Sequence, residues 1–169
     1  DLPLPSVHQV TIGVLEGGNG EGGTAFGPAR KRPTLYAHLK NYLDITDVTN
    51  FELGVSDALG SNDDNASFKV NVLGVDATLR HIIGQDQEIK LQSEAFYMKR
   101  REEAVFADDG TGAMSIISNQ GGDFWGGYAL FDARLSSRWG AGLRFDYVQP
   151  VDRLLSDPRR IETGITGYL

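Results

Sequence analysis

The sequence predicts an all-β fold, an antiparallel up-and-down transmembrane β-barrel or an eight-strand segment of a larger barrel. Two observations carry this prediction. In eight short stretches alternate residues are free of charge, while the residues between them hold many charges. The connections between these stretches alternate between long and short. Because successive side chains of a strand point to opposite faces of a sheet, each stretch has one apolar and one charged face.

The uncharged positions can be followed along the chain in order. They read V-I-V at 10–14, L-A-L at 35–39, F-L-V at 51–55, L-V-A-L at 73–79, I-L-S-A-Y at 89–97, W-G-A-F-A-L at 125–135, W-A-L-F-Y at 139–147 and I-T-I-G-L at 161–169. Branched aliphatic and aromatic residues dominate, as is typical of strands. None of these positions is charged, although the chain has 16 Lys or Arg and 23 Asp or Glu residues.

The interleaved positions hold the charges, and we predict that they line the lumen. They are Lys40, Glu52, Asp76, Arg80, Glu88, Lys90, Glu94, Asp132, Arg134, Arg144, Asp146, Arg160 and Glu162. Acids slightly outnumber bases in this set. A phosphate-selective pore would need a run of Lys and Arg to create a positive field. The mixture therefore favours a broad hydrophilic channel over a strongly anion-selective one.

The connections indicate that the uncharged positions face outward, towards lipid, and we expect Leu53, Val75, Leu91, Phe131 and Leu143 on the outer surface. Residues 16–33, 57–69, 99–123 and 149–159 form long gaps, and residues 43–48, 81–87 and 136–138 form short ones. Transmembrane barrels have short turns on one side of the membrane and longer loops on the other. The short connections also forbid parallel crossovers, so neighbouring strands should pair antiparallel in chain order. Residues 104–118 leave room for an extra strand or a short helix.

Aromatic residues at both ends of the uncharged positions give a second indication. Tyr97, Trp125 and Tyr147 adjoin long connections, whereas Phe51 and Trp139 adjoin short ones. Outer-membrane barrels carry girdles of such residues at both interfaces. The same residues are also common in strands of any kind.

Composition sets limits on the protein class. The length of 169 residues fits a single β-barrel domain over residues 1–169. A net charge of -7 speaks against nucleic acid as a partner. The chain has no cysteine, which excludes disulfides and thiolate chemistry. Residues 1–5 do not look like a signal peptide, so we expect a mature chain or an internal piece.

Five blocks, taken in order, resemble a known family. They are AHLKNYLD at 37–44, FELGVS at 51–56, GVDATLR at 74–80, SEAFYMKRRE at 93–102 and WGAGLRFDY at 139–147. The series is similar to the barrel of bacterial outer-membrane porins known as zinc-regulated outer-membrane receptors, which are related to phosphate-selective porins. The resemblance implies a pore or receptor barrel for small solutes. Family members are longer, so it also implies that this barrel domain is incomplete relative to the full-length protein.

Other candidate chemistry is weaker. His8, His38 and His81 lack metal-ligand spacing, and the acidic segments 62–65 and 108–110 lack the pattern of a calcium loop. The glycine-rich segment 17–23 lacks the lysine of a phosphate-binding loop. The basic residues 30–32 could contact lipopolysaccharide phosphates. We predict no cofactor, no metal site and no enzymatic activity.

Three functional hypotheses remain open from sequence alone. A segment of a larger barrel would line a water-filled channel in the bacterial outer membrane, with lipid or lipopolysaccharide outside and small hydrophilic solutes inside. Eight strands closing alone would leave an interior filled by side chains, giving a structural or anchoring protein. A soluble β-barrel that binds a ligand in an apolar interior would show the same alternation with its faces reversed.

The first testable prediction concerns charge on the two faces. Val75→Arg or Phe131→Arg should abolish membrane assembly, because a Lys or Arg at the bilayer midplane of a barrel costs about 2–4 kcal/mol. Asp132→Asn, next to Phe131 on the opposite face, should assemble normally. Folding into lipid vesicles, followed by electrophoretic mobility, measures both effects. Equal tolerance of both kinds of change would refute the assignment of faces.

Overall fold

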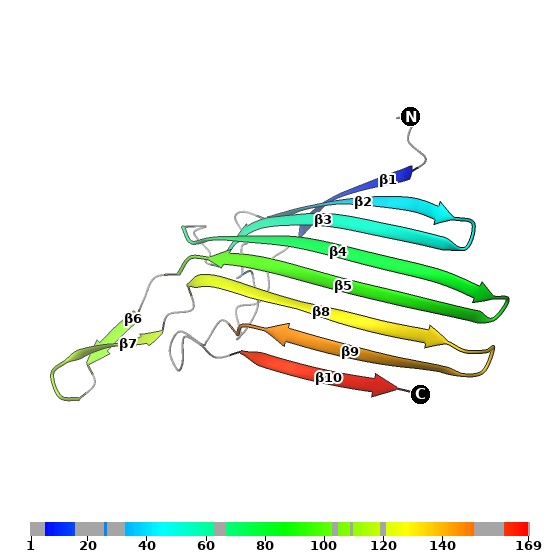
Figure 1. Cartoon of the computed structure of the whole chain (residues 1–169). Helices are drawn as coiled ribbons and strands as arrows, with labels where there is room; N and C mark the ends of the chain where they lie inside the picture. Colours follow the sequence, from blue (N-terminus) through cyan, green and yellow to red (C-terminus); the bar gives the residue numbers. More distant parts are fainter. Residues whose placement is uncertain are drawn as a thin grey trace.

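A computed structural model of the chain describes residues 6–15, 26, 33–62, 67–102, 105–108, 110–118, 121–150 and 161–168. Within these residues the fold is all-β. Eight strands form one antiparallel sheet in the order β1-β2-β3-β4-β5-β8-β9-β10, and β6 and β7 form a separate hairpin (Figure 1). The strands are β1 Ser6–Leu15, β2 Thr34–Thr46, β3 Thr49–Ser61, β4 Lys69–Gly84, β5 Gln87–Arg100, β6 Val105–Asp108, β7 Met114–Ser118, β8 Gly122–Arg134, β9 Gly140–Val148 and β10 Glu162–Tyr168.

All eight predicted strands are confirmed, and each pairs antiparallel with its neighbour along the chain. The short turns β2–β3, β4–β5 and β8–β9 lie at one end of the sheet, and the long connections lie at the other (Figure 1). Strands β3, β4, β5 and β8 extend into the long connections predicted at residues 57–69 and 99–123. The segment expected to hold an extra element contains the β6–β7 hairpin, which projects away from the sheet (Figure 1).

Of the two geometries that the sequence left open, the described residues do not show the eight strands closing into a barrel by themselves. In the described residues β1 pairs only with β2, and β10 pairs only with β9, so the sheet is open with two edges. An eight-stranded barrel has an interior just wide enough for packed side chains. Here the charged side chains do not fill a closed interior. They lie side by side on one face of the open sheet, where those of adjacent strands are neighbours. The described residues therefore do not form the small closed barrel on which the anchoring hypothesis depends.

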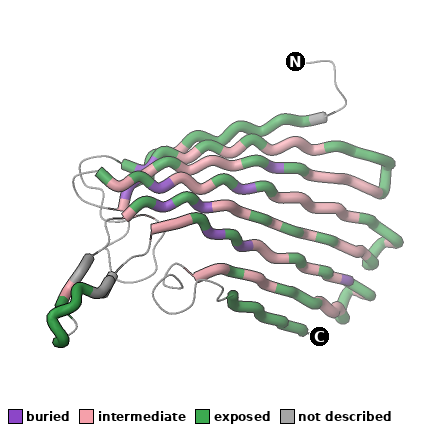
Figure 2. Tube along the Cα trace, turned by 60° about the vertical axis from the view of Figure 1, so that its left-hand side comes forward, coloured by how far each residue is buried: buried purple, intermediate pink, exposed green. Residues whose placement is uncertain are grey.

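The uncharged face of the sheet, which we call the apolar face, is exposed. Leu53, Val75, Leu91, Phe131 and Leu143 on five successive strands are 38–55% exposed. Along the strands, exposed residues alternate with partly buried ones (Figure 2). No described layer of structure covers this face. The five side chains expected on an outer surface are thus exposed and are not packed in a closed interior.

The opposite face, which we call the polar face, holds the hydrophobic core of the described residues. Val70, Met98 and Phe124 are almost fully buried, and Phe26 and Val72 pack against them. The three buried residues belong to β4, β5 and β8 and lie at the end of the sheet near the long connections. Their register places them on the same face as the charged residues, where the sequence pattern did not predict a core.

Glycines make room for large side chains on the polar face. A Cβ atom at position 126 would lie 2.2 Å from the ring of Phe96, and one at 142 would lie 2.4 Å from the ring of Tyr168. In each case the ring lies over the glycine of the neighbouring strand. An aromatic ring that covers a glycine in this way helps to fix strand register.

Gly127, on the apolar face, is packed more tightly because its neighbour is backbone. A Cβ atom there would lie 2.4 Å from the carbonyl oxygen of Glu94. We predict that Gly127→Ala destabilises the sheet by about 1–3 kcal/mol, the usual cost of overpacking. Gly167→Ala is the matched control on the same face, since its nearest contact would be an ordinary 3.6 Å. Urea unfolding measures both variants, and equal stability would contradict the β5–β8 packing.

Candidate functional site

The charged positions predicted from sequence share the polar face. The register forms continuous rows across the sheet, and one row reads Lys40–Gly54–Asp76–Glu94–Tyr128–Asp146–Gly164. The next row towards the short turns contains Glu52 and Arg144, and the following one contains Arg80, Lys90 and Asp132. Antiparallel pairing of strands with the same period therefore brings together residues that are far apart in the sequence. Glu162 lies on β10 at the outer edge.

Most of these charges form ion pairs between or along strands. Lys40 Nζ lies 2.7 Å from Glu52 Oε2, and Arg144 binds Asp146 at 2.7 Å. Lys90 lies 3.8 Å from Asp132. Nine of the twelve described charged positions predicted to line the lumen belong to such ion pairs, and Asp76 contacts His38. The face consequently presents many dipoles and little uncompensated charge.

Glu88 is the centre of the ionic cluster near the short turns. Its Oε2 atom accepts hydrogen bonds from Arg80 at 2.6 Å and from Arg134 at 3.2 Å. Arg80 and Lys90 are direct cross-strand neighbours, and like charges in such positions repel. The negative charges of Glu88, which binds Arg80, and of Asp132, which lies opposite Lys90, offset this repulsion.

His38 takes part in the site, although the sequence pattern indicated only a scattered histidine. Its Nε2 atom lies 3.0 Å from Asp76 Oδ1 on β4, with β3 between them. The carboxylate reaches across β3 because Gly54 leaves space, since a Cβ atom there would lie 2.1 Å from Asp76. The one sequence feature that points to this contact is Gly54, a glycine on β3 with the same parity as the charged residues. No group of three or more potential metal ligands occurs among the described residues.

Tyrosines on the same face were also missed, because the sequence reading followed charge alone. The Arg144 guanidinium lies 4.1 Å from the ring centroid of Tyr128, and Gln92 donates a hydrogen bond to the Tyr128 hydroxyl at 2.8 Å. The Tyr42 hydroxyl donates to Gln9 at 2.8 Å. The face therefore offers hydroxyls, amides and ring surfaces beside its paired charges, which suits water and polar solutes.

On β4, β5 and β8 the apolar face ends at a polar row near the long connections, whereas on β2 and β3 the same row holds Leu35 and Leu59. Asn71, Lys99 and Asp123 occupy this row, and Asn71 donates a hydrogen bond of 2.6 Å to Asp57. Asp57 belongs to β3, whereas the sequence reading placed it in a connection. In the next row the rings of Tyr97 and Trp125 lie 4.8 Å apart. The aromatic residues thus lie at the edge of the uncharged region, as expected from their places in the sequence.

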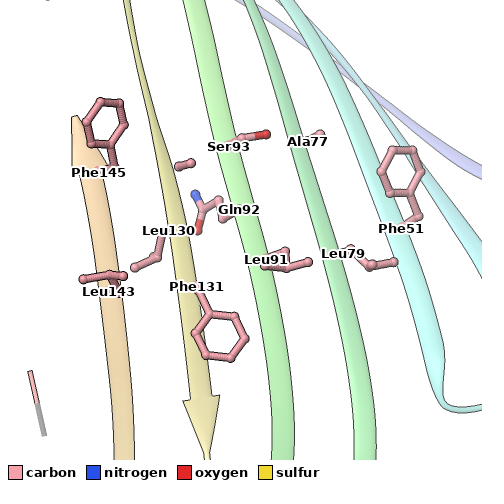
Figure 3. Close-up of a pocket in the computed structure, with 11 residues that line it drawn as sticks. Phe51, Ala77, Leu79, Leu91, Gln92, Ser93, Leu130, Phe131, Leu143 and Phe145 are labelled. Atoms are coloured by element: carbon pink, nitrogen blue, oxygen red, sulfur yellow. The ribbon is translucent and has the colours of Figure 1, made fainter. Parts of the chain in front are cut away.

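A shallow hollow of about 450 Å³ interrupts the apolar face. Small residues, Ala77, Ser93 and Ala129, form its floor on three adjacent strands. Phe51 and Phe145 stand at opposite sides of it (Figure 3). The hollow is apolar and holds none of the charged residues of the polar face.

Several sequence-based candidates have little or no part in this site. The Asp108 carboxylate accepts hydrogen bonds from the backbone N–H groups of Gly110 and Gly112, so it caps the turn of the β6–β7 hairpin. Segments 17–23 and 30–32, part of 62–65, and Arg160 lie outside the described residues. The described part of the chain contains no helix of the length and apolarity that a membrane crossing requires.

Double-mutant cycles test the geometry around Glu88. We predict that the coupling energy of Glu88 with Arg80 exceeds that with Arg134, because the Arg80–Glu88 distance of 2.6 Å is shorter than the Arg134–Glu88 distance of 3.2 Å. Both arginines are partly exposed, so both couplings should be small. Couplings of about 0.2–1 kcal/mol are typical of such pairs. Arg138, an exposed arginine in the β8–β9 turn, is the matched control and should show no coupling. Denaturant unfolding of Gln and Ala variants gives the values, and zero coupling for Arg80 would contradict the cluster.

Comparisons with known proteins do not add a relative. No protein-family model, no curated protein and no solved structure matches the chain. The family resemblance inferred from the five sequence blocks therefore stays a prediction.

Proposed function

We propose that this chain forms part of the wall of a larger β-barrel in the bacterial outer membrane. The barrel is a porin-type channel or receptor barrel through which small hydrophilic solutes pass. Its apolar face contacts lipid, and its polar face lines a water-filled lumen. One observation carries the proposal: the apolar face is bare across eight strands, while the only hydrophobic core in the described residues lies on the charged side.

A bare face of this size does not suit a protein surrounded by water. Exposed apolar patches of soluble monomers rarely exceed a few hundred Å². Here large side chains such as Ile12, Val75 and Leu143 are at least half exposed on strands from one edge to near the other. Hydrocarbon is an environment in which such a face costs no free energy. A soluble binding protein would instead enclose these side chains.

The height of the uncharged band fits a bilayer. On β5 it runs from Tyr97 to Ile89, and a rise of about 3.4 Å per residue makes this about 27 Å along the strand. A strand tilt of 35–45° reduces the height to about 19–22 Å, close to the ~25 Å apolar band of outer-membrane barrels. The polar residues Asn71, Lys99 and Asp123 lie just beyond the Tyr97 end of this band.

The two edges of the sheet explain why the barrel must be larger. A membrane-embedded sheet needs a hydrogen-bond partner for every backbone group, so only closed barrels are stable there. β1 and β10 each have one unpaired edge in the described structure. In the proposed barrel further strands pair with both edges. The resemblance to longer outer-membrane porins is in line with this arrangement.

The paired charges of the polar face support passage of small polar solutes with weak ionic preference. Each ion pair produces a local field that decays over a short distance. Salt screens the remainder within a Debye length, about 8 Å at physiological ionic strength. Charge therefore selects poorly, and the face serves mainly to solvate what passes.

Spin labels on single cysteines test the orientation of the faces, and no cysteine within residues 1–169 competes for the label. In the full-length protein in lipid vesicles, labels at Val75 and Leu91 should collide mainly with dissolved oxygen. Labels at the adjacent positions Asp76 and Gln92 should collide mainly with a water-soluble nickel chelate. The reverse pattern, or equal exposure to the chelate, would favour a soluble ligand-binding protein.

Single-channel recording tests transport. The full-length protein in planar bilayers should conduct with little preference between potassium and chloride, because acids and bases on the polar face nearly balance. Glu88→Gln should shift the preference slightly towards chloride, since it removes one negative charge between two arginines. A protein that inserts but stays sealed would contradict the channel proposal.

A further inference from the structure

Three cations lie close together at the end of the apolar face near the long connections. Lys69 begins β4, and Arg101 directly follows β5. They are opposite each other, because the Arg101 N–H donates a hydrogen bond of 3.0 Å to the Lys69 carbonyl oxygen. Lys99 lies two residues before Arg101. We call these three exposed residues the basic patch. Like charges directly opposite each other across strands repel, so the patch favours an anion.

The basic patch is only partly compensated by acidic side chains. None of its three cations forms an ion pair with another described residue. Of the described carboxylates nearby, Glu102 contacts Arg100 at 3.4 Å, and Asp57 accepts a hydrogen bond from β4. Asp123 lies opposite Lys99 and offsets one of the three positive charges. The described part of the patch therefore keeps a positive charge.

A hollow of about 410 Å³ adjoins the basic patch, and we call it the rim hollow. Lys69 is one of its lining residues, so a positive charge stands at its border. Leu35 and Leu59, which are each about half exposed, also line it. A chain of methylene groups suits this part of the hollow, because it buries apolar surface and needs no hydrogen-bond partner. One surface thus combines a place for an anion with a place for hydrocarbon.

The aromatic pair Tyr97 and Trp125 indicates the depth of the basic patch in a membrane. These rings lie one row closer to the middle of the apolar face than Lys99. Amphipathic rings prefer the level of the lipid headgroups. The basic patch therefore lies at or just beyond that level, on the side of the long connections. In outer-membrane barrels this side faces the exterior.

We propose that Lys69, Lys99 and Arg101 bind the phosphate groups of an outer-leaflet lipid whose acyl chain occupies the rim hollow. This inference rests on the membrane location in the proposed function. A free phosphate ion would leave the hollow empty, and a neutral lipid would leave the cations without an anion. Lipid A, the phosphorylated and acylated part of lipopolysaccharide, meets both requirements. On β2 and β3 the row of Lys99 holds leucines, so the basic patch occupies one sector of the barrel wall.

Native mass spectrometry of the full-length protein in detergent tests the site by counting bound lipid A molecules. Lys69→Gln should lower the affinity about fivefold, the usual contribution of one Lys or Arg at an anionic lipid surface. The triple variant Lys69→Gln, Lys99→Gln and Arg101→Gln should retain one lipid A molecule fewer. Arg138→Gln, which removes an exposed arginine at the opposite end of the sheet, is the matched control and should bind normally. Equal retention by the triple variant and the unchanged protein would overturn the inference.

Two further measurements identify the occupant. Leu59→Trp fills the rim hollow and leaves the cations in place, so it should also lower the affinity for lipid A. Inorganic phosphate at millimolar concentration should not displace the lipid, because it makes no contact with the hollow. Displacement by inorganic phosphate would overturn a lipid as the occupant. Protein dimers that disappear in the triple variant would instead assign the surface to a second copy of the chain.

Conductance of the unchanged protein in planar bilayers separates this inference from the channel proposal. Retention of lipid A that depends on the basic patch, in a protein that inserts but does not conduct, would mean that the channel function fails while the lipid site stands. Conductance together with retention that ignores the basic patch would overturn the lipid site alone.

Discussion

The two-residue repeat of the β-strand is the constraint on which the remaining structure depends. Every charged row of the polar face and every apolar row of the opposite face exists because eight strands keep the same parity through seven pairings. A slip of one residue in any pairing would transfer a whole strand of charges to the apolar face. The register is continuous from Val10 opposite Leu39 to Thr163 opposite Tyr147. Within the described part of the eight-stranded sheet, the register shifts only beside two short turns, after Asp44 and after Ile82.

Side-chain contacts on the polar face reinforce this register. An ion pair such as Lys40–Glu52 or a glycine covered by a ring, such as Gly126 under Phe96, is possible in only one alignment of the two strands. The contribution of each contact to the free energy of folding is modest, and opposite charges across strands contribute about 0.2–1 kcal/mol. Their more important effect is to disfavour other alignments of the strands. Misaligned sheets would leave the same charges without partners and would force side chains into the space above glycines.

The sequence predicted the strands and their order well, because both follow from local rules. Alternation over five to eleven residues marks a strand, and a short connection forces an antiparallel neighbour. Whether these eight strands close alone or belong to a larger barrel was left open by the sequence, since closure depends on the total number of strands and on curvature, which no local pattern encodes. The buried cluster around Phe124 was missed for a related reason. One residue that packs against it, Phe26, lies almost a hundred residues away in the sequence, and the positions of the cluster have the parity that carries charge in other parts of the chain.

The site residues divide in the same way. Their common face was predictable from parity, and the pairing of Glu88 with two arginines required the register. The contact between His38 and Asp76 could not be predicted from parity and register alone. It joins β2 to β4, which are not neighbours in the sheet, and it forms only because Gly54 on β3 leaves space between them. Asp57 is an exception to the rule that charged residues lie on the polar face. It has apolar parity but lies at the edge of the apolar face, where Asn71 satisfies it.

The β6–β7 hairpin has a consequence for the order in which the sheet forms. Hairpins joined by short turns close quickly, because few chain conformations are lost before the first contacts form. The pairing of β5 with β8 is different, since it must close the connection of residues 101–121. Loop-closure entropy grows with the number of free residues. A hairpin that forms first within this connection ties its two halves together and shortens the loop that remains. The small projecting element thus lowers the kinetic barrier at the one junction where nucleation would otherwise be slowest.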